Sequence, residues 1–198
     1  MAGMQPLPLP EVTQLLDRLP VKYQALCAIG VTTGCRITEI LALRRFDLLT
    51  SEGKLKERIA FLILKKKGKK TRHRKLAIPA KYRPYLLRHL IAEEEKGYDR
   101  PDDRVFRGHL NKPLSRFTVY HIFRKMLGPG YGTHWMRKTF AKEMFNYYLR
   151  KNTADPMRAL ELTRQALDHE RLDTTVRYLG IRESSIDEAQ NAIFNSEK

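Results

Sequence analysis

The spacing of apolar residues restricts the fold of this chain more than any other feature of its sequence. Over most of the length, apolar side chains return every three or four positions, as in Val12, Leu15, Leu16 and Leu19. That spacing is typical of one face of a helix. It predicts helices over residues 11–19, 23–31, 37–43, 81–95, 115–127, 133–149 and 157–167, and a last one near 186–194. We expect the first helix to begin at Pro10 or Glu11.

One stretch departs from the helical spacing. Ile59–Leu64 is a short apolar run, Arg74–Ile78 is a second, and the connection between them is polar and basic. Two short runs joined in this way predict a β-hairpin. Gly128-Pro129-Gly130 is a turn, but no repeat or shift in composition marks a domain boundary there. The sequence therefore predicts one domain, residues 1–198, that is mainly α with a small antiparallel β-sheet (α+β).

Net charge narrows the choice of partner. The 198 residues include 38 Lys+Arg against 22 Asp+Glu, a formal net charge of +16, which points to a polyanion such as nucleic acid. With 42% hydrophobic residues, the chain exceeds the composition of a disordered basic tail. Composition alone leaves an RNA-binding protein as an alternative, although the sequence carries no RNA-recognition signature.

Several classes of protein are disfavoured by what the sequence lacks. Its apolar runs are far shorter than the roughly 18 residues of a membrane span, and the N-terminus does not resemble a signal peptide. Cys27 and Cys35 are about two helical turns apart, too far to form a disulfide along one helix, which favours reduced cysteines and a cytoplasmic location. Zinc-type Cys/His spacing and glycine-rich phosphate loops are missing, so we expect neither a metal nor a cofactor.

The densest charge lies at the predicted hairpin, where eight of the eleven residues 65–75 are Lys or Arg. Taken alone, such a run is usually a solvated loop. On a hairpin it could instead follow a phosphate backbone, and each neutralised phosphate would add to the salt dependence of binding. The candidate DNA contacts in this run are Lys65, Lys69, Lys70, Arg72 and Arg74.

Two further segments place charged side chains at helical spacing. Arg36 opens a predicted helix, and Glu39 lies three residues further on, where a carboxylate can orient a guanidinium. Thr133 is a suitable N-cap, and His134 and Arg137 share a face of the helix that follows. Each pair by itself is more often structural than catalytic.

The order and spacing of these segments resemble the catalytic domain of the tyrosine recombinase (phage integrase) family, over nearly the whole chain from about Pro8 to Ile181. In that family's pattern an arginine follows Thr-Gly-x and precedes x-x-Glu, as in Thr33–Glu39 here. A lysine follows at the turn of a β-hairpin, where this chain has its basic run.

The rest of the family's pattern lies in the second half of the chain. His-x-x-Arg appears as His134 to Arg137, and a second histidine nine residues before the nucleophilic tyrosine appears as His169 before Tyr178. Lys138 stands where many relatives have His, and Asp168 stands where they have Gly. All six catalytic positions therefore occur in order.

The hairpin lysine has two candidates. Lys66 and Lys67 directly precede Gly68 and fit the Lys-x-Gly and Lys-Gly forms of the family. We favour Lys67 and keep Lys66 as the alternative.

The resemblance implies a site-specific DNA recombinase that cleaves and rejoins double-stranded DNA through a 3′-phosphotyrosyl intermediate, without metal or ATP. Tyr178 would be the nucleophile, Arg36, His134, Arg137 and His169 would stabilise the transition state or move protons, and the hairpin lysine would be the general acid. Glu39 would support Arg36. These roles suit phosphoryl transfer, because charge develops on the phosphate oxygens and on the leaving oxygen.

The resemblance also implies an oligomeric state on DNA and the kind of genome that encodes the chain. Relatives act as tetramers on DNA, and the segment 182–198 would be a C-terminal helix that is exchanged between protomers or packs on its own domain. The N-terminal core-binding domain of full recombinases is expected to be absent, and the chain is expected to be encoded by a prokaryote, virus or plasmid. Alternatives are a type IB topoisomerase or telomere resolvase, and a non-catalytic DNA-binding or regulatory protein of the same fold.

Overall fold

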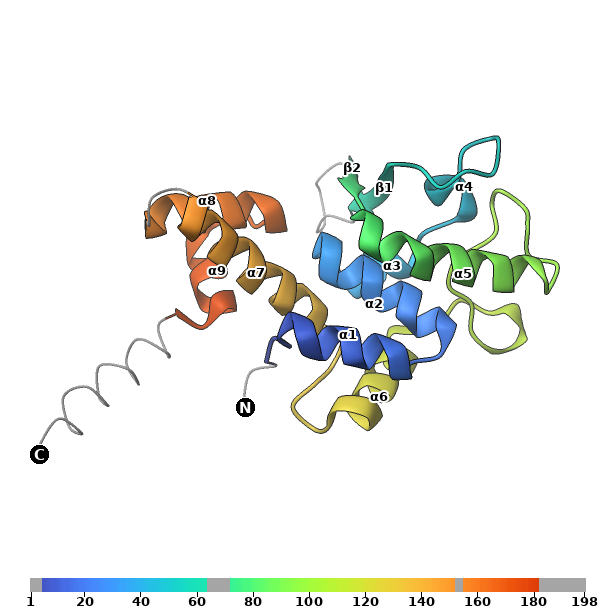
Figure 1. Cartoon of the computed structure of the whole chain (residues 1–198), viewed down its shortest axis with the longest axis horizontal. Helices are drawn as coiled ribbons and strands as arrows, with labels where there is room; N and C mark the ends of the chain where they lie inside the picture. The colour runs from blue at the N-terminus through green and yellow to red at the C-terminus, as the bar shows by residue number, and fades with distance from the viewer. Residues whose placement is uncertain (1–4, 64–71, 152–154, 182–198) are drawn as a thin grey trace, which may run out of the picture. The chain divides into compact units, whose positions relative to one another are not determined.

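The computed structural model describes residues 5–63, 72–151 and 155–181 (Figure 1). Two compact units make up the chain, Met1–Phe140 and Ala141–Lys198, and each is described by itself. In chain order the elements are α1 (Leu9–Arg18), α2 (Val21–Thr33), α3 (Ile37–Leu41), α4 (Arg45–Leu48), β1 (Arg58–Ile63), β2 (Arg72–Ala77), η1 (Ala80–Tyr82), α5 (Arg83–Glu94), η2 (His109–Asn111), α6 (Arg116–Leu127), α7 (Trp135–Lys151), α8 (Pro156–Leu167) and α9 (Leu172–Leu179).

Helix α2 is the centre of the first unit. Buried residues occur along its whole length from Gln24 to Thr33, whereas a surface helix buries one stripe. It packs against α1, α3 and α5, and Figure 1 shows α5 running alongside it. Gly30 of α2 faces Met136 of α7, where a Cβ would meet the methionine side chain. The small residue therefore lets the start of α7 approach α2 closely.

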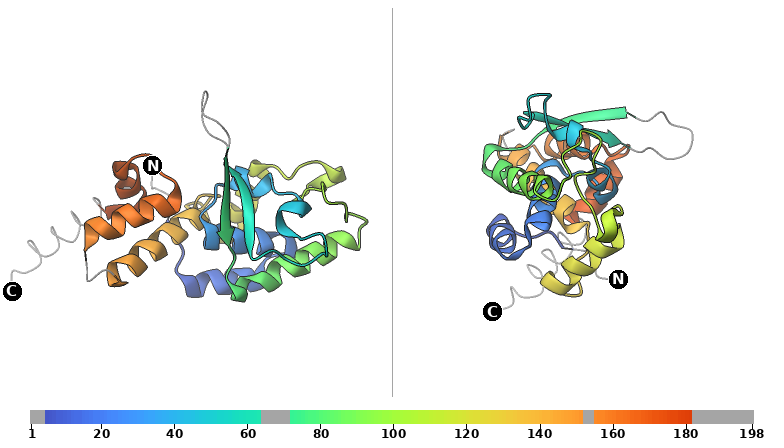
Figure 2. Two further views of the ribbon diagram at one scale, coloured as in Figure 1. Left: turned by 90° about the horizontal axis from the view of Figure 1, so that it is seen from above. Right: turned by 90° about the vertical axis from the view of Figure 1, so that its right-hand side faces the viewer.

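The predicted hairpin is confirmed. Strands β1 and β2 pair antiparallel with Phe61 opposite Arg74, and they lie side by side in Figure 2. Ile59, Phe61 and Ile63 alternate with partly exposed residues and point into the core, as a half-buried strand requires. The connection, residues 64–71, lies outside the described residues and with it most of the basic run.

Most predicted helices are present, with differences at their ends. The first begins at Leu9 rather than at Pro10 or Glu11, and α7 begins at Trp135 rather than at Thr133. The segment 37–43 yields only the five-residue α3, after which a separate short helix, α4, begins at Arg45. Two predicted helix starts agree with the structure to within one residue, and side-chain caps explain both. Ser115 Oγ accepts a hydrogen bond from Thr118 N at 3.1 Å at the start of α6, and Asp155 caps α8. The segment 186–194 lies outside the described residues.

The N-terminal segment anchors the start of α7 within the first unit. Leu7 N donates to Thr139 Oγ1 at 2.8 Å, and that hydroxyl donates to Leu7 O at 3.0 Å. Both groups are buried, so the pair satisfies backbone atoms that would otherwise be costly to bury.

A buried ionic cluster holds the loop after α5. Glu93 accepts from Lys96 Nζ at 2.9 Å and from Arg107 Nε at 3.3 Å, and Arg107 also pairs with Asp103 at 3.1 Å. The Arg107 guanidinium stacks on Tyr98, 3.3 Å from the ring centroid. Burial by itself raises the pKa of Glu93, but the bonds from Lys96 and Arg107 lower it overall. The charged side chains of this cluster therefore pair with one another within the fold.

Helix α8 packs against α9 in the second unit. Asp168, which stands where the family pattern has Gly, ends α8 in the left-handed conformation, with φ of 55°. Asp tolerates this conformation better than most side chains, so the turn forms without the glycine. In the part of the chain that the structure describes, no helix has both the length and the apolar character of a membrane span.

The turn between α2 and α3 depends on Gly34. This residue ends α2 in the left-handed conformation, with φ of 63°, and its N–H donates to Gly30 O at 3.0 Å. A Cβ at this position would overlap the ring of Phe140. Glycine is therefore needed both for the backbone conformation and for the space.

We predict that Gly34→Ala lowers the free energy of unfolding by more than Gly53→Ala. Gly53 also has positive φ, 74°, but a Cβ there would meet nothing within 4 Å, so the control carries only the conformational cost of about 1–2 kcal/mol. Gly34→Ala adds the overlap with Phe140, typically about 1–3 kcal/mol. Urea unfolding followed by circular dichroism measures both, and equal losses would contradict this account of the turn.

Candidate active site

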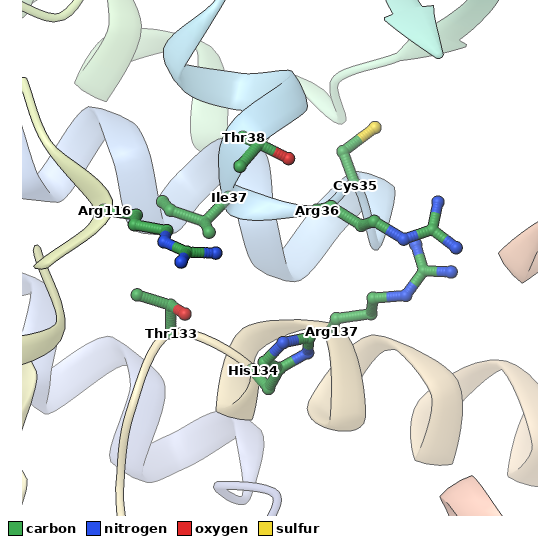
Figure 3. A pocket seen from close by; sticks show the side chains of 8 residues that line it. All are labelled: Cys35, Arg36, Ile37, Thr38, Arg116, Thr133, His134 and Arg137. Atoms are coloured by element: carbon green, nitrogen blue, oxygen red, sulfur yellow. The ribbon is translucent and has the colours of Figure 1, made fainter. Parts of the chain in front are cut away.

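A pocket of about 170 Å³ opens in the first unit where α3, the start of α6 and the start of α7 meet (Figure 3). A water molecule's share of liquid volume is about 30 Å³, so the pocket suits a group of phosphate size. Three arginines and one histidine contribute to its wall, and no carboxylate of the described residues does. The residues that line this Arg36 pocket are Cys35, Arg36, Ile37, Thr38, Arg116, Thr133, His134 and Arg137.

Arg36 is held by a carboxylate beneath it. Glu39, with 2% of its side chain exposed, accepts from Arg36 N at 2.8 Å and from Arg36 Nη1 at 3.0 Å. Both bonds follow from the three-residue spacing at the start of α3. The Arg36 side chain is 43% exposed, so the guanidinium is oriented by Glu39 while it still faces the pocket.

Arg137 reaches the same pocket from α7. Its side chain is buried, and Nη1 donates to the carbonyl oxygen of Gly34, the residue at the turn between α2 and α3. Figure 3 shows the Arg137 and Arg36 guanidinium groups beside each other at one end of the pocket. Two guanidinium groups placed in this way are suited to bind an anionic ligand.

His134 lies directly before α7, and its carbonyl accepts from Lys138 N at 3.0 Å. His134 is an exposed residue, yet partial burial lowers the pKa of its imidazole, and the charges of Arg137, Arg36 and Lys138 lower it further. A lowered pKa favours the neutral imidazole, in which one nitrogen donates a hydrogen bond and the other accepts one.

Cys35 lines the pocket but is unsuited to nucleophilic attack. Burial raises the pKa of its thiol to about 11, although the Thr33 hydroxyl and the charges of Arg74 and Arg137 act in the opposite direction. A thiol rather than a thiolate is present at neutral pH. Cys35 and Cys27 are both free and buried.

The second unit holds the other predicted pair. His169 is buried, and its Nδ1 lies 3.0 Å from Thr175 Oγ1, which fixes the plane of the ring. Arg164 Nη1 donates to His169 O at 2.6 Å and holds the turn that joins α8 to α9. The ring of Tyr178, on α9, meets the His169 ring edge-on, with centroids 5.4 Å apart and planes at 75°.

The predicted residues therefore fall into three groups. Arg36, His134 and Arg137 gather in the first unit, with Glu39 behind Arg36, whereas His169 and Tyr178 touch in the second. Of the hairpin candidates, Arg72 and Arg74 lie on β2. Lys65, Lys66, Lys67, Lys69 and Lys70 lie outside the described residues.

Arg116 is the pocket residue that the sequence analysis missed. It is the first residue of α6, and its side chain reaches the pocket from the side opposite Arg137 (Figure 3). The sequence signal for this position is Ser115, whose side chain caps α6 and so marks where the helix begins. The sequence does not indicate which other segments the start of α6 packs against, because this is decided by the tertiary structure.

The profile of the phage integrase family matches residues 7–184. This chain belongs to the phage integrase family, the tyrosine recombinases, which confirms the resemblance inferred from the motifs. A comparison with curated proteins gives no match.

Solved recombinase structures share the fold. XerA recombinase is 18% identical with a TM-score of 0.67, and the match covers 97% of this chain and 66% of that one. XerH site-specific recombinase bound to palindromic difH substrate is 24% identical with a TM-score of 0.62, covering 95% and 53%. The Tn1549 transposon integrase in complex with circular intermediate DNA is 19% identical with a TM-score of 0.61, covering 90% and 61%.

This chain thus spans between about half and two-thirds of the length of these three structures. The predicted fold class, mainly α with a small antiparallel sheet and the recombinase catalytic fold, is confirmed. Family and fold together support a role in site-specific recombination in general.

We predict that NMR titration of His134 gives a pKa below the 6.5 of an unperturbed imidazole. The Arg36→Gln variant removes one of the neighbouring cations, so the pKa of His134 should move back toward 6.5. Arg18→Gln, which removes an exposed charge at the end of α1, is the matched control and should leave it unchanged. A pKa above 6.5 in the unmodified chain would contradict the proposed electrostatics of the pocket.

Proposed function

We propose that this chain is a site-specific DNA recombinase that cleaves and rejoins DNA through a 3′-phosphotyrosyl intermediate. The convergence of Arg36, His134 and Arg137 on one pocket carries the proposal. The contact between His169 and Tyr178 supports it. The XerH and Tn1549 relatives were solved with DNA, which supports duplex DNA as the substrate here as well.

The two arginines would bind the scissile phosphate. Negative charge spreads over the non-bridging oxygens in the pentavalent transition state, and a guanidinium donates two parallel hydrogen bonds to such oxygens. Glu39 already orients Arg36, and Gly34 O already orients Arg137, so little reorganisation is needed when the phosphate arrives.

Tyr178 would supply the nucleophile. Its phenolic oxygen attacks phosphorus, the P–O5′ bond breaks, and the products are a 3′-phosphotyrosyl bond and a free 5′-hydroxyl. The covalent bond conserves the energy of the phosphodiester, so attack by another 5′-hydroxyl rejoins DNA without a high-energy cofactor. The tyrosine proton must leave during attack, and neutral His134 is suited to accept it or to donate to the phosphate.

His169 would hydrogen-bond a non-bridging oxygen. Thr175 holds its Nδ1 side, which presets the direction of the ring relative to Tyr178. The hairpin lysine, Lys67 or alternatively Lys66, would protonate the departing 5′-oxygen, because an alkoxide is a poor leaving group.

The remaining basic residues would hold the surrounding duplex. Arg72, Arg74 and the lysines Lys65, Lys69 and Lys70 belong to this group. We further propose a homo-tetramer on DNA and a single catalytic domain of about residues 8–181. The segment 182–198, which would be exchanged between protomers or pack on its own domain, lies outside the described residues.

We predict that Tyr178→Phe binds DNA normally and forms no covalent adduct, because only the nucleophilic oxygen is removed. Adducts are trapped in detergent and mapped by sequencing on DNA flanking the gene. Tyr147→Phe is the matched control, since Tyr147 is an exposed tyrosine of the same unit and should keep the adduct. Adduct formed by Tyr178→Phe would refute the nucleophile, and DNA binding without adduct from the unmodified chain would support a non-catalytic module.

We predict that alanine at the true general acid, Lys67 or Lys66, abolishes cleavage of a normal 5′-oxygen bridge and spares a 5′-thio bridge. A thiolate leaves without protonation, so the thio substrate separates loss of the acid from loss of binding. Single-turnover cleavage of both substrates at the mapped site is the measurement. Full cleavage of the oxygen substrate by both single variants would place the acid elsewhere.

A further inference from the structure

A second hollow of about 240 Å³ lies beside the Arg36 pocket in the first unit. The two share Thr38 and Arg116 in their walls, so they are adjacent. Leu41, Ala42 and Leu114 give the second hollow an apolar floor, and its charged residues are Arg104 and Arg116. In the part of the chain that the structure describes, no carboxylate lines it.

Arg104 and Arg116 reach this hollow from separate parts of the chain. Arg104 lies in the loop after α5, where its backbone pairs with Arg44, and Arg116 is the first residue of α6. The Ser115 cap sets where the helix starts and therefore where Arg116 leaves the backbone. Two guanidinium groups thus converge although nothing local in the sequence joins them.

Arg104 and Arg116 differ from the arginines that form ion pairs within the fold. Arg45 pairs with Glu94 and Arg107 with Glu93, whereas Arg104 and Arg116 have no carboxylate partner among the described residues. Two like charges that converge on a hollow repel each other unless an anion lies between them. The arrangement therefore calls for an anionic ligand rather than for an internal ion pair.

We propose that this hollow, the Arg104–Arg116 subsite, binds a DNA backbone phosphate next to the scissile one. The inference rests on the proposed function, which assigns the scissile phosphate to the Arg36 pocket. Phosphates of one strand follow each other at about 3.4 Å along the duplex axis, and two adjacent hollows that share Arg116 match such a series. The Thr38 hydroxyl, at the shared wall, adds a neutral donor.

Two bound phosphates would fix the strand better than one. A single phosphate can rotate within its pocket, whereas a second contact sets the direction of the strand and the register of the scissile bond. The subsite holds a phosphate that does not react, so it binds ground state and transition state alike. It is expected to govern affinity rather than the rate of the chemical step at saturating DNA.

The test compares Arg104→Gln, Arg116→Gln and the double variant with the control Arg18→Gln, in the full chain. The probe is a short duplex of random sequence, and its affinity is measured between about 50 and 200 mM salt. Loss of one phosphate contact should reduce the slope of log affinity against log salt by about 0.9 in the double variant. Over that fourfold range, the double variant should lose about 3.5-fold less affinity than the unmodified chain.

Charge and folding are separated by two further measurements. Arg116→Lys keeps the charge and should restore most of the slope, and thermal unfolding checks that each variant is folded. Arg116 is exposed, so Arg116→Gln tests the subsite even if substitution of the half-buried Arg104 unfolds the chain.

The inference is overturned if the folded variants show the same slope and affinity as Arg18→Gln while the unmodified chain binds DNA. It is also overturned if adduct formation at saturating DNA slows in Arg116→Gln with no change in affinity, because Arg116 would then act on the reacting phosphate. Absence of DNA binding and adduct in the unmodified chain would instead refute the proposed function itself.

Discussion

The hydrogen bond from Arg137 to the carbonyl of Gly34 joins the two segments on which the Arg36 pocket depends. The two residues are 103 positions apart, and Gly34 adopts a left-handed conformation at a place where a Cβ would overlap the ring of Phe140. Burying a guanidinium is costly unless its donors find acceptors. The same contact that satisfies Arg137 therefore also positions it beside Arg36, so fold and site share one constraint.

The basic residues that give the chain its net charge of +16 differ in the partners that they have within the fold. Arg45 and Arg107 pair with carboxylates and stabilise the first unit. Arg36 pairs with Glu39, while the wall of the Arg36 pocket brings together three arginines and, among the described residues, no carboxylate. Positive potential in a small pocket attracts phosphate more strongly than the same charges spread over a solvated surface.

Much of the fold could be predicted from the sequence because its signals are local. Helical spacing located most helices, and two short apolar runs located the hairpin. The predictions were wrong where local signals are weak: α7 starts at Trp135 rather than at Thr133, and the segment 37–43 ends early as α3. At Asp168 the family pattern led us to expect a glycine, and the aspartate adopts the left-handed conformation that glycine favours.

The sequence by itself determined the types of elements, the excess of positive charge, and the spaced motifs that name Arg36, His134 and Arg137. These properties depend on neighbours within a few residues, which a sequence pattern records directly. Only the tertiary structure decided that these three side chains share a pocket, that Arg116 joins them, and that Arg104 meets Arg116 in a second hollow. Such convergence depends on packing between segments tens of residues apart, and no local spacing encodes it.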